Sequence, residues 1–321
     1  MLHFDRGLKL TDFDLGIDMR RRQARGFISH AHADHVAKHE LAFCTPETAK
    51  LYFHRHGVRR VCELPFGETR DFNGTKLTTF PAGHVLGSAM LLAEVRGTKL
   101  LYTGDFKLGP TLTAGIAQPP PADVLVMEST YGDPAYRLPP RNASCDKLID
   151  IVQCALRDGI TPVIHAYVLG KAQEVTRILT RAGIPVLQHA LAYDISEIYE
   201  LCGVELGDYK LYPGKALPGH AVIVPPAHQR GFRLPGLQRV RTISVTGWAL
   251  NPHGRYRQYV DHAIPLSDHA DFDQLIACVE QVAPRVVLCT HGSPSFVDHL
   301  RERGYNAHVL AEDAHVLAKT W

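Results

Sequence analysis

The segment His30-Ala31-His32-Ala33-Asp34-His35 places three imidazoles and one carboxylate within six residues. Imidazole and carboxylate groups are common protein ligands of divalent metal ions. The segment directly follows the run 26–29, which we expect to end a strand. Ligands at the end of a strand are held by a rigid element, and a solvated, histidine-rich turn would lack that support. The segment therefore predicts a metal site.

Four further segments place a histidine or an aspartate beside small residues, where a predicted strand ends or a helix begins. The residues concerned are His84, Asp105, His269 and His291. Glycines next to three of them allow the backbone to turn sharply. Any one of these segments alone would more often be a capped turn. Together with the segment 30–35, they indicate that distant parts of the chain assemble one site.

The helices and strands that must position these residues follow different patterns in different parts of the chain. Short strands dominate the first third, and one helix follows Thr45, a good N-cap. After the proline-rich stretch 132–141, helices and strands alternate, which is typical of an α/β domain with a parallel sheet. We expect domains over 1–136, 137–245 and 246–321, the middle one an insertion. The predicted strands are 25–29, 76–80, 89–96, 99–103, 124–128, 162–168, 184–189, 221–225, 241–246, 285–290 and 307–310. The predicted helices are 46–56, 143–158, 171–182, 194–202, 271–282 and 294–303.

The composition is that of an ordinary globular protein, with 321 residues of which 45% are hydrophobic and 21% charged. No apolar run reaches the roughly 18 to 20 residues that span a bilayer. The N-terminus shows no secretory signal. Seven cysteines without a C-x-x-C pair argue against a disulfide framework and a zinc ribbon. We therefore expect a cytoplasmic protein with no membrane association.

The net charge of +2 hides several clusters of arginine. Each cluster alone is more often a solvated surface than a site. Several together suit a polyanionic partner better than a small neutral substrate. The clusters are Arg20, Arg21, Arg22 and Arg25; Arg59 and Arg60; Arg230 and Arg233; Arg239 and Arg241; Arg255 and Arg257.

The order of these motifs closely resembles that of the metallo-β-lactamase fold, and further motifs resemble the β-CASP nucleases. M-E-S-T-Y-G at 127–132 is similar to the acidic motif of these nucleases. L-G-K-A-Q-E at 169–174 is similar to the helix start in their inserted domain, and S-D-H-A-D at 267–271 and T-H-G at 290–292 resemble their last two histidine motifs. The resemblance covers essentially the whole chain. It implies a protein of the α/β class. The expected architecture is a four-layer αββα metallo-β-lactamase sandwich with an inserted α/β β-CASP domain.

The resemblance implies a centre with two divalent metal ions, Zn²⁺ or Mn²⁺, and a metal-bound hydroxide that attacks phosphorus. The first ion would take His30, His32 and His84. The second ion would take Asp34, His35 and His291, and Asp105 would bridge both ions. Asp34 is also counted among the residues required for catalysis.

His269 is the candidate that protonates the leaving oxygen, and Glu128 is the candidate that holds its imidazole. Two alternatives stay open: Glu128 as the cap of a backbone N–H, and His269 as a further metal ligand. The expected substrate contacts are Ser129, Thr130, Lys171 and Trp248, although Trp248 could equally be a core aromatic residue.

The resemblance implies a metal-dependent nuclease that leaves 5′-phosphates. His291 favours the RNA-cleaving branch, because the Artemis-like DNA branch usually carries valine there. The T-G-W segment 246–248 and L-S-D-H-A-D at 266–271 instead resemble the bacterial ligase-associated exonucleases. We favour DNA as the substrate, with 5′ exonuclease action in DNA repair and functional association with a DNA ligase and a helicase.

Three other functions stay open. One is an RNA endonuclease or exonuclease of the ribonuclease J or 3′-end processing type. A glyoxalase-like hydrolase of small molecules is less consistent with the inserted domain. An inactive scaffold homologue is less consistent with an intact set of metal positions.

Overall fold

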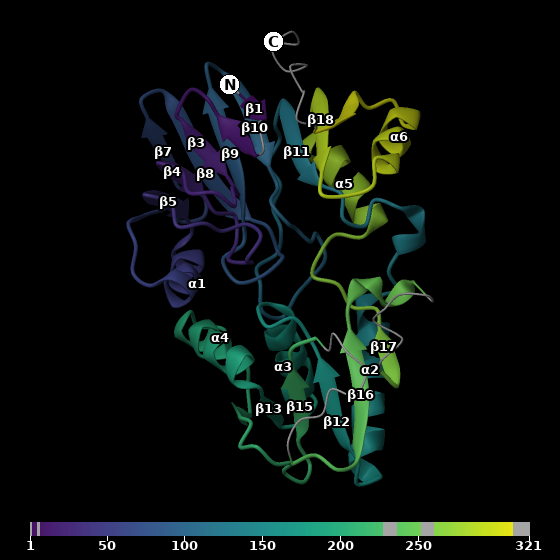
Figure 1. The fold of residues 1–321 in the computed structure, drawn as a ribbon. Coiled ribbons are helices and arrows are strands. Elements are labelled where there is room, and N and C mark those ends of the chain that lie inside the picture. Colours follow the sequence, from purple (N-terminus) through teal and green to yellow (C-terminus); the bar gives the residue numbers. More distant parts are fainter. Residues whose placement is uncertain (1, 5–6, 227–235, 252–259, 311–321) are drawn as a thin grey trace. The chain divides into compact units, whose positions relative to one another are not determined.

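The structure is a computed structural model that describes residues 2–4, 7–226, 236–251 and 260–310. The chain divides into two compact units (Figure 1). The first unit comprises Met1–Pro110, Ala114–Pro134 and His269–Trp321. The second unit comprises Thr111–Thr113 and Ala135–Asp268.

The first unit contains two sheets. The six-stranded sheet follows the chain in the order β1-β2-β3-β4-β5-β6, and the seven-stranded sheet has the order β19-β18-β11-β10-β9-β8-β7. The strands of the first sheet are Leu2–Phe4, Leu8–Leu10, Leu15–Ile17, Arg25–Phe27, Leu41–Cys44 and Val61–Glu63 for β1 to β6. Those of the second are Thr69–Phe72, Thr75–Pro81, Ala89–Val95, Thr98–Tyr102 and Val124–Glu128 for β7 to β11, with Val286–Thr290 for β18 and Ala307–Val309 for β19.

The alternation of side chains along each strand explains how these sheets form layers. Leu100 and Tyr102 of β10 lie in the core between the sheets, with Phe27 and Phe43 of the other sheet. Leu101 points to the opposite face, where it packs with residues of α5 (Phe272–Val282) and α6 (Ser295–Glu302). Helix α1 (Pro46–His56) covers the outer face of the first sheet. The predicted αββα sandwich is therefore confirmed.

Capping residues fix the ends of two helices in the first unit. Thr45 accepts a hydrogen bond from the Thr48 backbone N–H, and Pro46 occupies the first helical position. Asp271 accepts a hydrogen bond of 2.9 Å from the backbone N–H of Gln274. The predicted helix over 46–56 is confirmed, and the Asp271 cap fixes the chain two residues after His269.

The second unit is built on one parallel sheet with the order β14-β13-β15-β12-β16-β17. Its strands are Thr161–His165, Val186–Gln188, Tyr209–Leu211, Ala221–Val224, Val240–Val245 and His262–Ile264 for β12 to β17. Its α-helices are α2 (Arg141–Arg157), α3 (Lys171–Arg181) and α4 (Ala190–Leu201). The described residues also form two short 3₁₀ helices, η1 (Pro134–Tyr136) and η2 (Gly247–Leu250). The predicted parallel sheet is confirmed.

The structure differs from the sequence expectation in the second unit at strand β14, which the sequence did not predict, at the start of α4 and at the edge of the sheet. Helix α4 begins at Ala190 instead of 194, because the His189 imidazole accepts a hydrogen bond from the backbone N–H of Leu191. The predicted block 137–245 stops inside the sheet, because β17 pairs with β16 at the edge. The unit therefore extends to Asp268.

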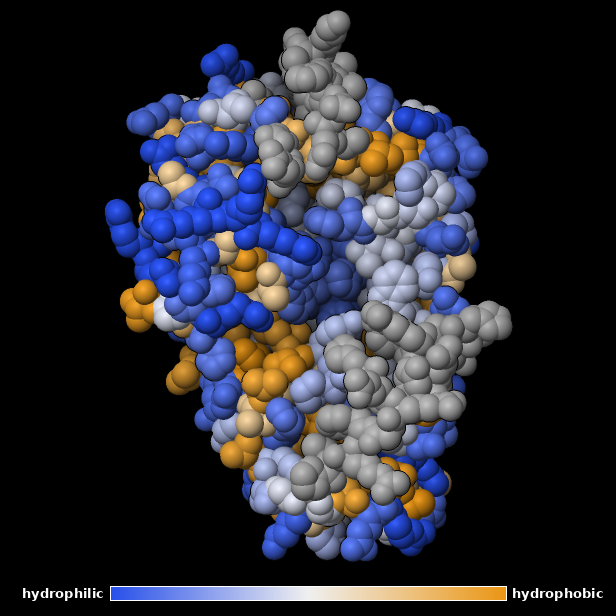
Figure 2. All heavy atoms as spheres, in the orientation of Figure 1, coloured by the Kyte–Doolittle hydropathy of each residue, from blue (hydrophilic) through white to orange (hydrophobic). Residues whose placement is uncertain are grey.

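The state of the cysteines, the search for membrane-spanning helices and the hydropathy of the surface can be compared with the sequence. All seven cysteines are free thiols. Within the described ranges, no helix is both long enough and apolar enough to cross a membrane. Hydrophilic and hydrophobic residues are interspersed on the face drawn in Figure 2. Arg230, Arg233, Arg255 and Arg257 lie outside the described residues.

Candidate metal centre

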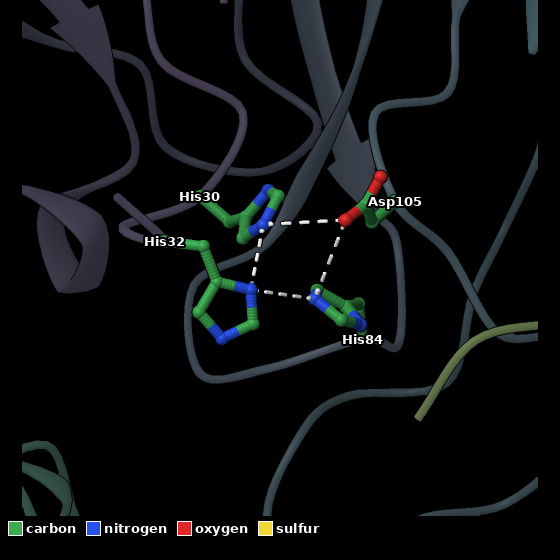
Figure 3. A group of neighbouring side chains, drawn as sticks. All are labelled: His30, His32, His84 and Asp105. Atoms are coloured by element: carbon green, nitrogen blue, oxygen red, sulfur yellow. Dashed lines mark hydrogen bonds and ion pairs between the residues drawn. The ribbon is translucent and has the colours of Figure 1, made fainter. Parts of the chain in front are cut away.

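Three imidazoles and one carboxylate converge on one point in the first unit (Figure 3). Nδ1 of His32 lies 3.0 Å from Nε2 of His30 and 3.1 Å from Nε2 of His84. Oδ2 of Asp105 lies 3.6 Å from Nε2 of His30. All four ligand atoms lie within 4.8 Å of one another. The predicted ligands of the first ion and the predicted bridging carboxylate are thus gathered in one place.

The ends of three strands bring these residues together. His30 follows β4, His84 follows β8 and Asp105 follows β10. A hydrogen bond of 2.9 Å from the backbone N–H of Ala89 to the carbonyl of Ser29 joins the two sheets next to His30. The turn before His84 requires glycine, because Gly83 has φ +72° and a Cβ there would lie 2.4 Å from a backbone oxygen. Backbone geometry therefore holds these ligands.

The donor set fits a divalent metal ion. Ligands bound about 2.1 Å from one ion lie roughly 3 to 3.4 Å apart, which is close to the nitrogen separations observed here. His30 is fully buried. Burial, followed by the neighbouring imidazoles, lowers the pKa of His30 well below its ordinary value. His30 is therefore neutral and offers a lone pair to a cation.

A second group of ligand-type residues adjoins the same carboxylate. Nε2 of His35 lies 3.5 Å from Oδ2 of Asp105 and 3.9 Å from Oδ2 of Asp34. The His291 ring lies beside that of His35, with 5.7 Å between the ring centroids. Asp105 Oδ2 thus lies near imidazoles of both groups, as the predicted bridging role requires.

The electrostatics of Asp105 also fit a bound cation. Burial, and next the negative charge of Glu128, raises the pKa of the Asp105 carboxyl to about 7. A cation beside the carboxylate would oppose both effects and favour the ionised form. The site therefore has a buried carboxyl group whose ionisation a metal ion would stabilise.

Asp18 belongs to this centre, although the sequence analysis missed it. Its Oδ2 lies 2.8 Å from Nδ1 of His35, and it also accepts hydrogen bonds from the hydroxyls of Ser29 and Tyr102. A carboxylate on one imidazole nitrogen orients the ring and leaves the other nitrogen for a metal. The available signal was the position of Asp18 directly after β3, a strand too short for its pattern to be recognised.

We expect the Asp18→Asn variant to bind divalent metal about 10- to 100-fold more weakly, because His35 loses the partner that orients it. Titration of the metal-free protein with Zn²⁺ against a coloured chelator measures this change. Tyr102→Phe removes one donor to Asp18 but keeps the carboxylate, so it is the matched control. Equal metal affinity in Asp18→Asn and the wild type would contradict this role.

His269 lies beside the candidate ligand His84, and Glu128 accepts a hydrogen bond from its imidazole. The ring centroids of His269 and His84 are 4.6 Å apart. Nδ1 of His269 lies 3.0 Å from both carboxylate oxygens of Glu128. The same carboxylate accepts hydrogen bonds from the backbone N–H of Phe106 and the hydroxyl of Thr130. Glu128 therefore makes both of its anticipated interactions, with the imidazole and with a backbone N–H.

The hydrogen bonds keep Glu128 ionised in a buried position. Burial alone would raise the pKa of Glu128, but His269 and the donors from Thr130 and Phe106 hold it below its ordinary value. An ionised carboxylate on Nδ1 favours a protonated imidazole and leaves Nε2 for another partner. This arrangement can deliver a proton.

Comparisons with known proteins indicate the family of this chain. A family model described as "RMMBL: Zn-dependent metallo-hydrolase RNA specificity domain" matches residues 260–313. A "Probable DNA ligase" from Opitutus terrae is 37% identical over 314 residues, which are 97% of this chain and 31% of that protein. An "RNase J-like protein" from Methanocaldococcus jannaschii is 32% identical over 177 residues, 47% of this chain and 42% of that protein. The chain belongs to the metallo-β-lactamase β-CASP family.

The fold of this β-CASP chain is also found among solved structures. One of them is a crystal structure of a protein of unknown function from Enterococcus faecalis V583, with a TM-score of 0.62 and 17% identity. The likeness covers 89% of this chain and 79% of that chain. The β-CASP chain spans less than half the length of each of the two relatives above.

Two expected substrate contacts of the β-CASP chain use their hydroxyls within the protein. Ser129 is 1% exposed, and its hydroxyl donates to the carbonyl of Thr290. The Thr130 hydroxyl donates to Glu128 over 2.5 Å. The Ser129 hydroxyl thus binds the end of the strand that precedes His291, and the Thr130 hydroxyl binds the carboxylate of Glu128.

The chain next to His291 approaches Ser129 so closely that it requires glycine. A Cβ on Gly292 would lie 1.9 Å from the backbone oxygen of Ser129. His291 itself has φ 53°, a conformation that few residues other than glycine adopt. The position of His291 therefore depends on the close approach of Gly292 to Ser129.

We expect Gly292→Ala to lower the free energy of unfolding by about 3 kcal/mol, because the new methyl group overlaps a backbone atom. Gly304→Ala is the control, since Gly304 has φ +86° but no atom within 4 Å of its Cβ position. It should cost about 1 kcal/mol through backbone strain alone. Urea denaturation measures both values, and equal losses would contradict the importance of the close approach.

Lys171 and Trp248, the other expected substrate contacts, lie in the second unit. Lys171 is 2% exposed, and its Nζ lies 3.3 Å from Oδ1 of Asp268. Trp248 is half-buried in η2, with its ring edge-on to Tyr136 at 5.2 Å between centroids. Substrate contact by either residue stays a prediction.

Proposed function

We propose that this chain is a metal-dependent nuclease that hydrolyses phosphodiester bonds in DNA, acting as a 5′ exonuclease in DNA repair. The observation that carries the proposal is the position of Asp105. Its Oδ2 lies 3.6 Å from Nε2 of His30 and 3.5 Å from Nε2 of His35, between two groups of ligand-type residues. Such an arrangement suits two neighbouring ions of the kind that hydrolyse phosphodiesters.

Each group of residues has a distinct role in this proposal. Two bound divalent ions would supply Lewis-acid polarisation of the phosphate and acidification of water. Asp105 would contact both ions, and Asp18 would keep His35 oriented. Three residues would hold the first ion and three the second: His30, His32 and His84, then Asp34, His35 and His291.

The leaving oxygen needs a proton, and His269 can provide it. Glu128 holds Nδ1, so the proton on Nε2 is the one available to the leaving group. Glu128 stays ionised while it does so, and thereby stabilises the imidazolium. The location of His269 beside His84 supports this role over that of a remote structural histidine.

The choice of DNA rests on the extent of one sequence match. The "Probable DNA ligase" of Opitutus terrae matches 97% of this chain, whereas the RNase J-like protein matches 47%. That match also supports functional association with a DNA ligase. Association with a helicase stays a prediction from the resemblance alone.

RNA is the second candidate substrate. The family model that matches residues 260–313 carries "RNA specificity domain" in its description, and one relative is named RNase J-like. His291 is also the residue type found in the RNA-cleaving branch. These observations favour an RNA endonuclease or exonuclease over a hydrolase of small molecules.

End-labelled DNA and RNA of matched sequence test both candidates. The chelated protein should be inactive, and Mn²⁺ or Zn²⁺ should restore cleavage. We expect progressive shortening of single-stranded DNA from its 5′ end and products that carry 5′-phosphates. Internal cleavage of RNA with intact DNA would favour the second candidate. Turnover of a thioester with neither nucleic acid cleaved would overturn both, and complete inactivity with every metal would indicate a scaffold.

A further inference from the structure

A cavity of about 390 Å³ in the first unit adjoins the second group of ligand-type residues. Asp34 and His291 both line it, and so does Asp18, the carboxylate that orients His35. Sites for small ligands have volumes of about 300 to 1,000 Å³, so this cavity has room for one small building block of a larger substrate.

Two arginines at the cavity supply positive charge. Arg20 and Arg21 both line the cavity, and both are exposed. Nε of Arg20 donates to the backbone carbonyl of Asp34 over 3.2 Å, which ties this arginine to the metal site. Among the residues that the structure describes, none forms an ion pair or a hydrogen bond with the guanidinium of Arg21.

Arg22, the next arginine in the sequence, differs from Arg21 both in its position relative to the cavity and in having a partner. Arg22 does not line the cavity, and its Nη2 lies 3.3 Å from a carboxylate oxygen of Glu40. A guanidinium that has no partner among the described residues and lies next to a cavity can bind an anion such as phosphate. The three consecutive arginines are therefore not equivalent, and Arg21 is the one available to a ligand.

Apolar residues form another part of the cavity wall. Leu8 of β2, Ile17 of β3 and Met19 line it, and each is at most 6% exposed. Because two of these residues belong to the sheet, this wall is rigid. An apolar surface suits the flat face of a base or the carbons of a sugar, whereas an inorganic anion would gain nothing from it.

We propose that this cavity is a subsite for the nucleotide unit that adjoins the scissile phosphate. Its base or sugar lies against Leu8, Ile17 and Met19, and its phosphate is bound by Arg21 with support from Arg20. Each acidic group at the cavity has a partner of its own: Oδ2 of Asp18 lies 2.8 Å from Nδ1 of His35, and Oδ2 of Asp34 lies 3.9 Å from Nη2 of Arg20. The inference rests on the proposed function, since it names how that site would hold the nucleic acid.

Binding without turnover tests the subsite. Metal-free wild-type protein, Arg21→Gln and Arg22→Gln are mixed with a fluorescein-labelled single-stranded oligonucleotide, and anisotropy gives the Kd at several salt concentrations. Arg21→Gln should raise the Kd about three- to tenfold and reduce the slope of log K against log salt by about 0.7. Arg22→Gln makes the same charge change one residue away, and it should change the Kd less than about twofold.

Competition distinguishes a nucleotide site from a simple anion site. Thymidine 5′-monophosphate should displace the oligonucleotide at lower concentration than either thymidine or inorganic phosphate, because it uses both the apolar wall and the arginine. Arg21→Gln should abolish the advantage of the nucleotide over thymidine, because the phosphate then loses its partner. Competition by phosphate equal to that by the nucleotide would overturn the subsite.

The same oligonucleotide separates this inference from the proposed function. Wild-type cleavage with Mn²⁺, together with equal Kd values for Arg21→Gln and Arg22→Gln, would overturn the subsite and leave the nuclease assignment standing. Selective loss of binding in Arg21→Gln, together with no cleavage by the wild type under any metal, would support the subsite and overturn the nuclease.

Discussion

Asp105→Asn is expected to lower phosphodiester hydrolysis by roughly a thousandfold or more, the largest effect of any single change in this chain. Asp105 is a buried carboxylate whose Oδ2 lies within 3.8 Å of Nε2 of three imidazoles, on His30, His35 and His84. The amide keeps the shape of the side chain but removes the negative charge that two neighbouring cations need. The loss should therefore appear in metal content as well as in rate.

Two measurements check this prediction. Elemental analysis should find fewer metal ions per protein in Asp105→Asn than in the wild type, and rates on single-stranded DNA should fall together with occupancy. Asp298→Asn is the control, because Asp298 is an exposed residue of α6 that pairs with Arg301 on the same helix. Full metal content and full activity in Asp105→Asn would exclude a bridging role.

His269→Ala is expected to lower cleavage of DNA by about 10²- to 10⁴-fold without loss of metal, because the leaving oxygen then departs without a proton. The size of the effect should depend on the leaving group. Thymidine 5′-(p-nitrophenyl phosphate) releases a nitrophenolate that needs no proton, so the variant should hydrolyse it nearly as well as the wild type does.

This pair of substrates separates two roles of His269 that the sequence leaves open. A proton donor gives a large loss on DNA and a small loss on the nitrophenyl ester. A metal ligand gives similar losses on both substrates and a lower metal content. His54→Ala is the matched control, since His54 is an exposed histidine of α1. Equal losses on both substrates would contradict the proton-transfer role.

The sequence predicted the main elements because their signals are local. Thr45 and Pro46 mark the start of α1, and alternating helices and strands predicted a parallel sheet in the middle of the chain. Strands β1 to β3 were missed, since each has only three residues and too little pattern to recognise. The extension of the second unit to Asp268 was missed for a related reason: β17 joins its sheet by pairing with β16.

The candidate ligands were also predictable, because their residue types and their places at strand ends are visible in the chain. The sequence alone determined that imidazoles and carboxylates gather where strands end, and its motif order determined the expected fold. Only the tertiary structure decided how those groups are supported. Asp18 orients His35 from 17 residues away and accepts a hydrogen bond from Tyr102, 84 residues distant.

The sequence likewise did not determine the partners of the hydroxyl groups of Ser129 and Thr130 or those of the arginines. Ser129 and Thr130 look like substrate contacts in the sequence, yet one donates to Thr290 and the other to Glu128. Arg21 and Arg22 are adjacent and chemically identical, but Arg21 lines the cavity beside His291 and Arg22 does not. Sequence specifies which groups are present, whereas partners, burial and access to a cavity depend on residues that folding brings together from distant parts of the chain.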